Sequence, residues 1–322
     1  MSLGCRIRRN FERPSKELVE AFRGIPVANI DDNCGRIAAV DSSIYPLNPK
    51  ARLLGTAFTV NAPAGDNLLF HKALDMAQPG DVIVLANKGS MSRALFVTGT
   101  GTDIGKTFVT GLIIKKLAEY NQNPGYYKAA MSGNERRPDG SLIPGDALFV
   151  QQTSGIRQSL EEMCPYVYEN AYSPHLASRI EGNPVELSVV KKGFLDVTSK
   201  YDYVTVEGSG GILCPICFDE RRIQLEDVIR ELHLPSILIA DAGLGTINSV
   251  VLTVEYMRSH NLPLKGMIFN HFHLGNVMEE DNIFMCEHMT GLPTLARVKD
   301  SDTELNIDAD VLTSLYEEVN LK

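Results

Sequence analysis

Residues 94–107 have the sequence ALFVTGTGTDIGKT, a short apolar run that leads into a glycine-rich loop. Beyond the loop, apolar residues recur at the spacing of one helix face, at Val109, Leu112, Ile113 and Leu117. A strand, a glycine-rich loop ending in Gly-Lys-Thr and a helix form a P-loop. Gly99 and Gly105 enclose five residues instead of the usual four, so the loop is a variant. We therefore predict an α/β fold, a P-loop NTPase with a mostly parallel sheet flanked by helices.

The chemistry of such a loop follows from its backbone. Glycines let N–H groups turn inward around phosphate oxygens, and the helix N-terminus adds partial positive charge at the same place. Lys106 can reach the β- and γ-phosphates of a nucleotide, and the hydroxyl of Thr107 can ligate Mg²⁺. The alternative is a chance Gly-Lys-Thr sequence, which the matching strand and helix disfavour.

Three further polar residues end expected strands or open an expected helix. Lys128 ends the strand 126–128, Glu207 ends the strand 204–207, and Asp146 opens an amphipathic helix. Ligands of open α/β sheets gather at the carboxyl ends of the strands, so these residues could surround Mg²⁺ and ATP together with Thr107. Taken singly, they could equally be a surface lysine, a helix N-cap and a strand-end charge.

Five motifs follow one another along residues 91–322: VTGTGTDIGKT (97–107), YK with SG (127–128 and 132–133), GDA (145–147), VEGSGG (206–211) and LGTIN (244–248). In their order and spacing they resemble the dethiobiotin synthetase family. The resemblance implies an enzyme that converts 7,8-diaminononanoate, CO₂ and ATP into dethiobiotin, ADP and phosphate in biotin biosynthesis. It implies a carbamate, then a carbamic–phosphoric anhydride, then closure of the ureido ring.

The resemblance also implies roles for single residues. Lys106 and Lys128 would be catalytic, and Thr102 and Ser132 would contact the diamine end of the substrate. Mg²⁺ would be held by Thr107, Asp146 and Glu207. Those three residues and Lys106 would also contact ATP, with Asp103, Ile104, Gly105, Phe108, Gly208, Ser209, Gly210, Asn270, His271, Val298, Lys299 and Asp300. Asp103 stands where many relatives have glutamate.

The carboxylate tail of the substrate is expected at another helix N-terminus. A strand over 236–240 leads into a loop, and Thr246 begins a long helix whose N-terminus can bind an anion. Gly245, Thr246 and Asn248 are the predicted contacts, although an ordinary turn and cap is an alternative for Gly245 and Asn248. In the family this helix comes from the partner subunit, which implies a homodimer with shared active sites.

Composition excludes several classes of protein. The chain has 322 residues and a formal net charge of −9, so it lacks the basic field that non-specific nucleic-acid binding needs. No apolar run approaches the ~18 residues of a membrane span, and the arginine-rich N-terminus does not suit a signal peptide. We therefore expect a cytoplasmic protein that uses small-molecule substrates, with its six cysteines reduced.

Two other P-loop functions stay open. An ATP-driven switch of the partitioning kind usually has an extra lysine early in the loop, and residues 99–105 contain none. An amidating ligase of the cobyrinate type would be expected to carry a glutamine-hydrolysing domain after the ATPase domain, and the sequence up to Lys322 contains none. His271 and His273 have no third metal ligand at a suitable spacing, and Cys214 and Cys217 have no second cysteine pair, so we expect no metal or redox site at either pair and buried thiols at the cysteines.

The first ninety residues have a different character. They contain expected strands over 54–60 and 82–86 and expected helices over 18–22, 27–33 and 67–77. The stretches VANIDD (27–32), GTAFTV (55–60), GDNL (65–68) and QPGDVIV (78–84) resemble the regulator of ribonuclease E activity and the related class II pyruvate aldolases. In that family the substrate- and metal-binding residues come later than the matching part.

We therefore predict two domains. Residues 1–90 would be a truncated α/β segment without an active site, and residues 91–322 would be the P-loop enzyme. Residues 1–90 are slightly basic, whereas the rest of the chain carries the whole acidic excess. The acidic residues near the C-terminus, Asp308, Asp310, Glu317 and Glu318, are expected on a solvated helix face.

Overall fold

A computed structural model describes residues 12–25, 53–63, 67–88 and 92–320. The chain divides into two compact units, Met1–Ser90 and Met91–Lys322.

The described part of the first unit is a small α/β arrangement. Its elements are α1 (Lys16–Glu20), β1 (Thr56–Pro63), α3 (Asn67–Met76) and β2 (Asp81–Lys88). The strands β1 and β2 pair in parallel, with Thr56 opposite Asp81, and Phe58 and Ala73 are buried where α3 packs on the sheet. These elements correspond to four of the five that the sequence predicts. The fifth, a helix over 27–33, lies outside the described residues.

The second unit alternates strands and helices. Its strands are β3 (Arg93–Gly99), β4 (Pro124–Lys128), β5 (Ala130–Met131), β6 (Glu135–Arg136), β7 (Leu142–Ile143), β8 (Tyr166–Val167), β9 (Tyr203–Glu207), β10 (Pro215–Phe218), β11 (Arg222–Gln224), β12 (Ser236–Asp241), β13 (Leu264–Asn270), β14 (Thr294–Arg297) and β15 (Glu317–Glu318). Its helices are α4 (Lys106–Glu119), α5 (Gly145–Ser154), α6 (Leu160–Met163), α7 (Pro174–Glu181), α8 (Leu187–Thr198), α9 (Leu225–Glu231), α10 (Thr246–Ser259), α11 (Val277–Thr290) and α12 (Ala309–Ser314).

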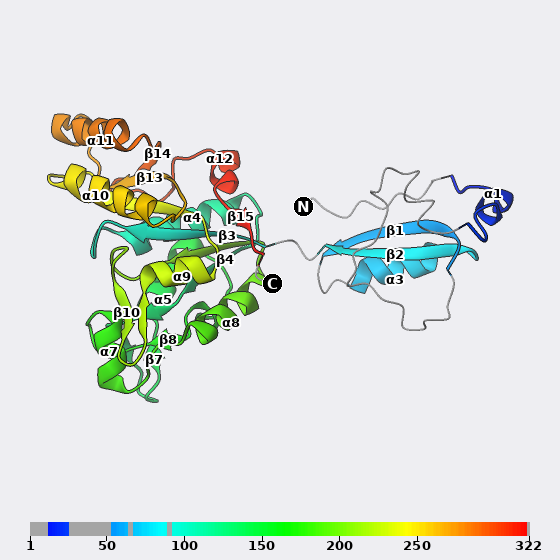
Figure 1. Cartoon of the computed structure of the whole chain (residues 1–322), viewed down its shortest axis with the longest axis horizontal. Helices are drawn as coiled ribbons and strands as arrows, with labels where there is room; N and C mark the ends of the chain where they lie inside the picture. Colours follow the sequence, from blue (N-terminus) through cyan, green and yellow to red (C-terminus); the bar gives the residue numbers. More distant parts are fainter. Residues whose placement is uncertain (1–11, 26–52, 64–66, 89–91, 321–322) are drawn as a thin grey trace. The chain divides into compact units, whose positions relative to one another are not determined.

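One central sheet organises this unit (Figure 1). Its strands lie in the order β14-β13-β12-β3-β9-β4, all parallel, and β15 pairs antiparallel with β3. The strand order reverses at β3, so the loop that follows β3 lies at the switch point where open α/β sheets bind ligands. The predicted fold class, a P-loop NTPase with a mostly parallel sheet, is confirmed.

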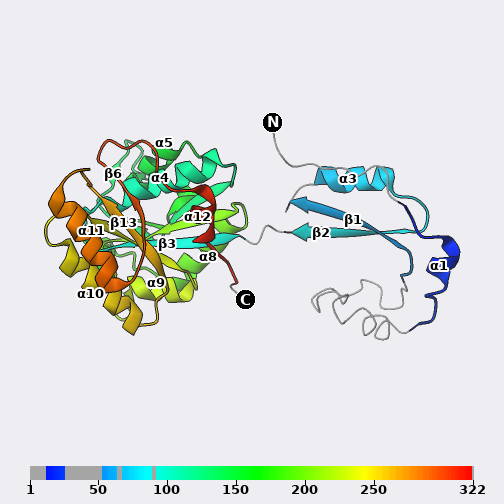
Figure 2. The same ribbon diagram turned by 90° about the horizontal axis from the view of Figure 1, so that it is seen from above.

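Alternating side chains of β3 face two different cores. Leu95 and Val97 pack with α4, whereas Ala94 and Phe96 pack with side chains of α8 and α9. Figure 2 shows α4 and α9 on opposite sides of β3. From Ala94 onward β3 is buried on both faces, so its sequence over 94–97 is a continuous apolar run instead of an alternation of apolar and polar residues. This burial fixes the start of the phosphate loop.

The acidic C-terminal residues are arranged differently from the expected helix face. Asp308 caps α12 by accepting hydrogen bonds from the N–H groups of Asp310 and Val311, but Glu317 and Glu318 form β15. They pair with Ala94 and Arg93 at the start of β3. The prediction of one helix face was therefore wrong for these two residues, because backbone pairing with β3 overrides their low strand propensity.

Candidate active site

The loop between β3 and α4 takes its form from Gly105. This glycine is the N-cap of α4 and has φ of 81°, a conformation that L side chains rarely adopt. A Cβ atom at this position would also collide with the side-chain amide nitrogen of Asn270. Asp103, which has φ of 59°, lies exposed at the tip of the loop. The loop therefore depends on glycine at position 105 for both its turn and its contact with β13.

Lys106 crosses the loop that precedes it. Its side chain is buried, and Nζ donates a hydrogen bond to the carbonyl oxygen of Gly101 at 2.6 Å. Burial and the positive charge of Lys128 together lower the pKa of this ammonium group. Nζ thus lies inside the loop, the position from which a P-loop lysine meets phosphate oxygens.

Lys128 joins two carboxylates from neighbouring elements. At the end of β4, its Nζ donates to Glu207 Oε1 at 2.6 Å and to Asp146 Oδ2 at 2.7 Å. The hydroxyl of Thr107, in the first turn of α4, donates to the same Glu207 Oε1 at 2.8 Å. The parallel strands β4 and β9 place Lys128 directly opposite Glu207. The structure therefore brings together four of the predicted residues: Thr107, Lys128, Asp146 and Glu207.

The two carboxylates differ in their contact with solvent. The side chain of Glu207 has no exposed surface, whereas 40% of the Asp146 side chain is exposed. Burial lowers the pKa of the Lys128 ammonium, but the charges of Glu207 and Asp146 outweigh it and hold that pKa above its ordinary value. For Asp146, burial favours the neutral acid, yet Lys128 holds the carboxyl pKa below its ordinary value. Lys128 and Asp146 are thus both charged at neutral pH.

Tyr126 also contacts Glu207, and sequence reasoning missed it. Its hydroxyl donates to Glu207 Oε2 at 3.0 Å, and its side chain is fully buried. Burial and the charge of Glu207 raise the pKa of this phenol well above its ordinary value. Side chains two apart on a strand share a face, so the position of Tyr126 relative to Lys128 was a usable signal.

The oxygen atoms of this cluster fit Mg²⁺ better than a transition metal. Two carboxylates and a hydroxyl are hard ligands of the kind that Mg²⁺ prefers, and the cluster already holds a cation, the Lys128 ammonium, between its carboxylates. Within residues 12–320, as far as they are described, no group of three or more His, Cys, Asp or Glu residues could hold a metal ion. Thr107 therefore has to contribute if Asp146 and Glu207 hold one.

A second corner of the loop is formed by the end of β13. Asn270 is fully buried, and its Nδ2 donates to the carbonyl oxygen of Ile104 at 3.1 Å. Its Oδ1 has no hydrogen-bond partner among the described residues. Next to it, His271 Nδ1 lies 2.5 Å from Asp300 Oδ1. An amide with an available buried acceptor beside the phosphate loop can receive an N–H group of a base.

The other residues predicted to contact ATP lie around the same loop. The N–H of Val298 donates to Phe269 at the end of β13, and Lys299 follows it in an exposed turn. After β9, the N–H of Gly208 donates to Val97, and Ser209 Oγ donates to Ala130 at 2.7 Å. Phe108 packs against the core on α4. Contact of these residues with ATP stays a prediction.

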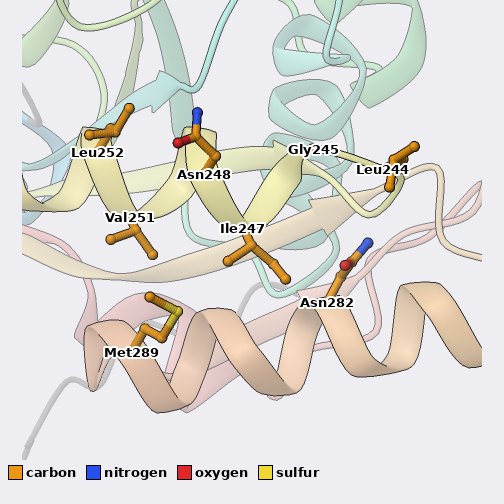
Figure 3. A pocket seen from close by; sticks show the side chains of 8 residues that line it. All are labelled: Leu244, Gly245, Ile247, Asn248, Val251, Leu252, Asn282 and Met289. Atoms are coloured by element: carbon orange, nitrogen blue, oxygen red, sulfur yellow. The ribbon is translucent and has the colours of Figure 1, made fainter.

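The residues predicted to bind the substrate fall into two places. Thr102 is exposed beside Gly210, and Ser132 is half-buried beyond β5. Gly245 and Asn248 instead line a pocket of ≈ 450 Å³ between α10 and α11 (Figure 3). Thr246, at the N-terminus of α10, is buried, and within the described structure its hydroxyl has no partner. The substrate residues are thus divided between the phosphate loop and α10.

The cysteine and histidine pairs are not arranged as metal sites. Cys217 is buried as expected, but Cys214, which lies next to Gly210 in the glycine turn, is only half-buried. In the described part of the chain, all four cysteines are free thiols. His273 Nδ1 contacts Glu279 at 3.1 Å, and His271 pairs with Asp300. Each histidine therefore has a carboxylate partner of its own.

Two protein families match parts of the sequence. Residues 93–304 match the family described as AAA domain, and residues 25–115 match the family described as Aldolase/RraA. Among the described residues, no helix is long and apolar enough to cross a membrane. The first match covers the P-loop unit, and the second begins in the N-terminal unit.

Curated relatives match the P-loop unit over their full length. The chain is 50% identical over 228 residues to the ATP-dependent dethiobiotin synthetase BioD of Brachyspira hyodysenteriae, covering 70% of this chain and 100% of that protein. It is 45% identical over 229 residues to the protein of the same name from Clostridium botulinum, covering 71% and 100%. A solved ParA family ATPase from Chlorobium tepidum shares 14% identity with a TM-score of 0.39, covering 70% of this chain and 88% of that one.

Proposed function

The chain belongs to the AAA-domain family and, within it, to the ATP-dependent dethiobiotin synthetases, and from this premise we propose that its P-loop unit closes the ureido ring of dethiobiotin. The substrates are 7,8-diaminononanoate, CO₂ and ATP. The observation that carries the proposal is the position of Lys128, whose ammonium group lies buried between Glu207 and Asp146 and shares a carboxylate oxygen with Thr107 of the phosphate loop.

Every step of the reaction builds or moves negative charge. An amine of the substrate captures CO₂ as a carbamate and loses a proton. The carbamate oxygen then attacks the γ-phosphate and displaces ADP, and the second amine attacks the carbamoyl carbon, loses a proton, closes the ring and expels phosphate. A protein accelerates such steps with fixed cations and correct positioning. Lys106 and Lys128 are the two buried cations of the described site, and their neighbours fix both in place. No covalent nucleophile is needed.

We assign each lysine a separate task. Lys106, which points into the loop, binds the β- and γ-phosphates in the ground state. Lys128, at the end of β4, stabilises the charge that develops where the carbamate meets the γ-phosphate. Thr102 and Ser132 orient the diamine end, and Asn270 receives the adenine base. Binding by Lys106 and stabilisation by Lys128 should therefore separate in the kinetics.

We further propose that Thr107, Asp146 and Glu207 hold Mg²⁺. The ion would neutralise charge on the β- and γ-phosphates when bound. The support is the set of hard oxygen atoms that meet around Lys128 and Thr107. Lys128 now occupies the space between the same carboxylates, so it would share them with a bound ion.

A homodimer would unite the two groups of substrate residues. We propose that α10 of a second copy supplies Gly245, Thr246 and Asn248 to bind the carboxylate tail. The lining of the pocket in Figure 3 supports an apolar contact with a second copy, because the side chains of Leu244 and Leu252 there are 90% and 63% exposed. Replacing Leu252 with aspartate should give a monomer by light scattering and raise the KM for diaminononanoate; a dimer of unchanged activity would contradict the proposal.

The test of the function is an assay of the purified chain with ATP, Mg²⁺, diaminononanoate and bicarbonate. We expect dethiobiotin by mass spectrometry and release of phosphate that requires both the diamine and bicarbonate. ATP hydrolysis without the diamine would favour an ATP-driven switch, and consumption of glutamine or ammonia would favour an amidating ligase. Since ATP is abundant in the cytoplasm, we propose that the reaction takes place there.

A further inference from the structure

Three donors hold the carboxylate of Glu207, and one of them lies outside the predicted machinery. Thr107 and Lys128 both donate to Oε1, whereas the hydroxyl of Tyr126 donates to Oε2. Glu207 has no exposed side-chain surface, so water does not compete for either oxygen. Tyr126 is thus the partner of Oε2.

The orientation of this carboxylate decides which of its two oxygens faces Thr107 and Lys128. The terminal torsion of a glutamate side chain is broad, so its own energy does not fix which way the two oxygens point. With Oε2 held by Tyr126, Oε1 faces Thr107 and Lys128. Loss of the phenol hydroxyl would leave Oε2 buried without a donor, and the carboxylate would rotate to regain one.

We propose that Tyr126 is a positioning residue for the metal and phosphate chemistry of this site, acting through Glu207. The proposal rests on the proposed function, because the role of Glu207 does. Tyr126 does not touch substrate in this assignment. It orients Glu207, which in turn positions the Lys128 ammonium and presents Oε1 to Mg²⁺.

The chain contains a matched control on the adjacent residue. Tyr127 is also fully buried on β4, and its hydroxyl donates to the backbone carbonyl of Val190 at 2.7 Å. Successive side chains of a strand point to opposite faces, so Tyr127 contacts α8 instead of the active site. Replacing either tyrosine with phenylalanine removes one buried hydroxyl and keeps the ring.

The experiment compares Tyr126→Phe with Tyr127→Phe in the full chain. For Tyr126→Phe we expect the Mg²⁺ concentration at half-maximal rate to rise about tenfold, the effect of one hydrogen bond to a charged group. For Tyr127→Phe we expect wild-type Mg²⁺ dependence. Rates are measured below the melting temperature of the less stable variant, so that a loss of folding does not enter the comparison.

A double-mutant cycle separates positioning from a structural role. If Tyr126 acts through Glu207, then Tyr126→Phe should have no further effect on Mg²⁺ dependence in a Glu207→Gln background. Additive effects, or equal Mg²⁺ curves for the two phenylalanine variants, would overturn the proposal.

Calorimetric titration of ATP binding at several Mg²⁺ concentrations gives the same comparison without turnover. If the wild-type protein makes no dethiobiotin but binds ATP with Mg²⁺, the proposed function fails. The titrations then still decide the role of Tyr126: a higher Mg²⁺ requirement for ATP binding in Tyr126→Phe than in Tyr127→Phe supports it, and equal Mg²⁺ curves overturn it.

Discussion

Replacing Lys128 with methionine should abolish turnover and also destabilise the fold by a calculable amount. Methionine keeps most of the side-chain volume but removes the charge that joins Glu207 and Asp146. Removing one partner of a buried ion pair costs about 3–5 kcal/mol, because the other charge stays buried. Glu207 retains hydrogen bonds from Thr107 and Tyr126, and Asp146 is 40% exposed and therefore screened by water. We therefore expect the lower end, about 3 kcal/mol.

Thermal unfolding of the full chain measures this loss. For a unit of this size, 1 kcal/mol corresponds to about 2–4 °C, so the melting temperature of the P-loop unit should fall by roughly 6–12 °C. Mg²⁺ should raise the melting temperature of the variant more than that of the wild type, because the two carboxylates would attract the ion without competition from an ammonium group. ATP should still bind through Lys106.

The matched control is Lys200→Met. Lys200 Nζ lies 2.8 Å from Glu162 Oε1, a distance like those of Lys128, but about half of its side chain is exposed. Exposed pairs contribute little, so its melting temperature should stay close to that of the wild type. Equal shifts for the two variants, or dethiobiotin formation by Lys128→Met at a near wild-type rate, would refute the reasoning.

The pH dependence of the Lys128→Met effect has a defined sign. The pKa of Lys128 is raised above its ordinary value of 10.5, so its stabilisation is complete below about pH 10 and is lost as the pH rises further. The pKa of Asp146 is lowered below 3.8, so its contribution is present above that pH and is lost in stronger acid. The difference between wild type and variant should be constant from about pH 5 to 9 and shrink outside this range.

Three other predictions can be tested with the same assays. Gly105→Ala should weaken ATP binding about tenfold or more, since the new methyl group meets both backbone strain and a side-chain collision; Gly291→Ala, with φ of 66° but open space around it among the described residues, should leave binding unchanged. Asp146→Asn and Glu207→Gln should each raise the Mg²⁺ requirement, and Mg²⁺ titrations that overlay the wild type would make both residues structural. Residues 91–322 alone should fold and form dethiobiotin at the full-length rate, and an inactive or unfolded product would show that residues 1–90 belong to the functional unit.

Local patterns in the sequence predict the core of this site well. The segment around Lys106 combines an apolar strand, a glycine-rich loop and helical spacing within a few turns, so neighbours along the chain determine its structure. Lys128 and Glu207 end buried strands, and the parallel pairing of β4 with β9 brings them together. The sequence also contains the signal for Tyr126, because alternation along β4 places it on the same face as Lys128, two residues away.

Features that depend on distant parts of the chain were harder to predict. Nothing local shows that Asn270 packs against Gly105, because the contact depends on the order of strands in the sheet. The pairing of Glu317 and Glu318 with β3 is similar: two glutamates have low strand propensity, and a partner more than 200 residues away gives them a strand conformation. Contacts between distant parts of the chain therefore determine both the Asn270–Gly105 contact and the β15 strand.

The pairing of β15 with β3 also has a consequence for engineering. It places Glu318 opposite Arg93, so the two ends of the described P-loop unit lie next to each other. They meet at the amino end of β3, and the phosphate loop follows the carboxyl end of the same strand. Adjacent ends of this kind suit circular permutation. A short linker could join them, and new termini could be opened at Gly140, which is exposed in the turn between β6 and β7. The permuted enzyme would keep every strand of the sheet and the phosphate loop unbroken.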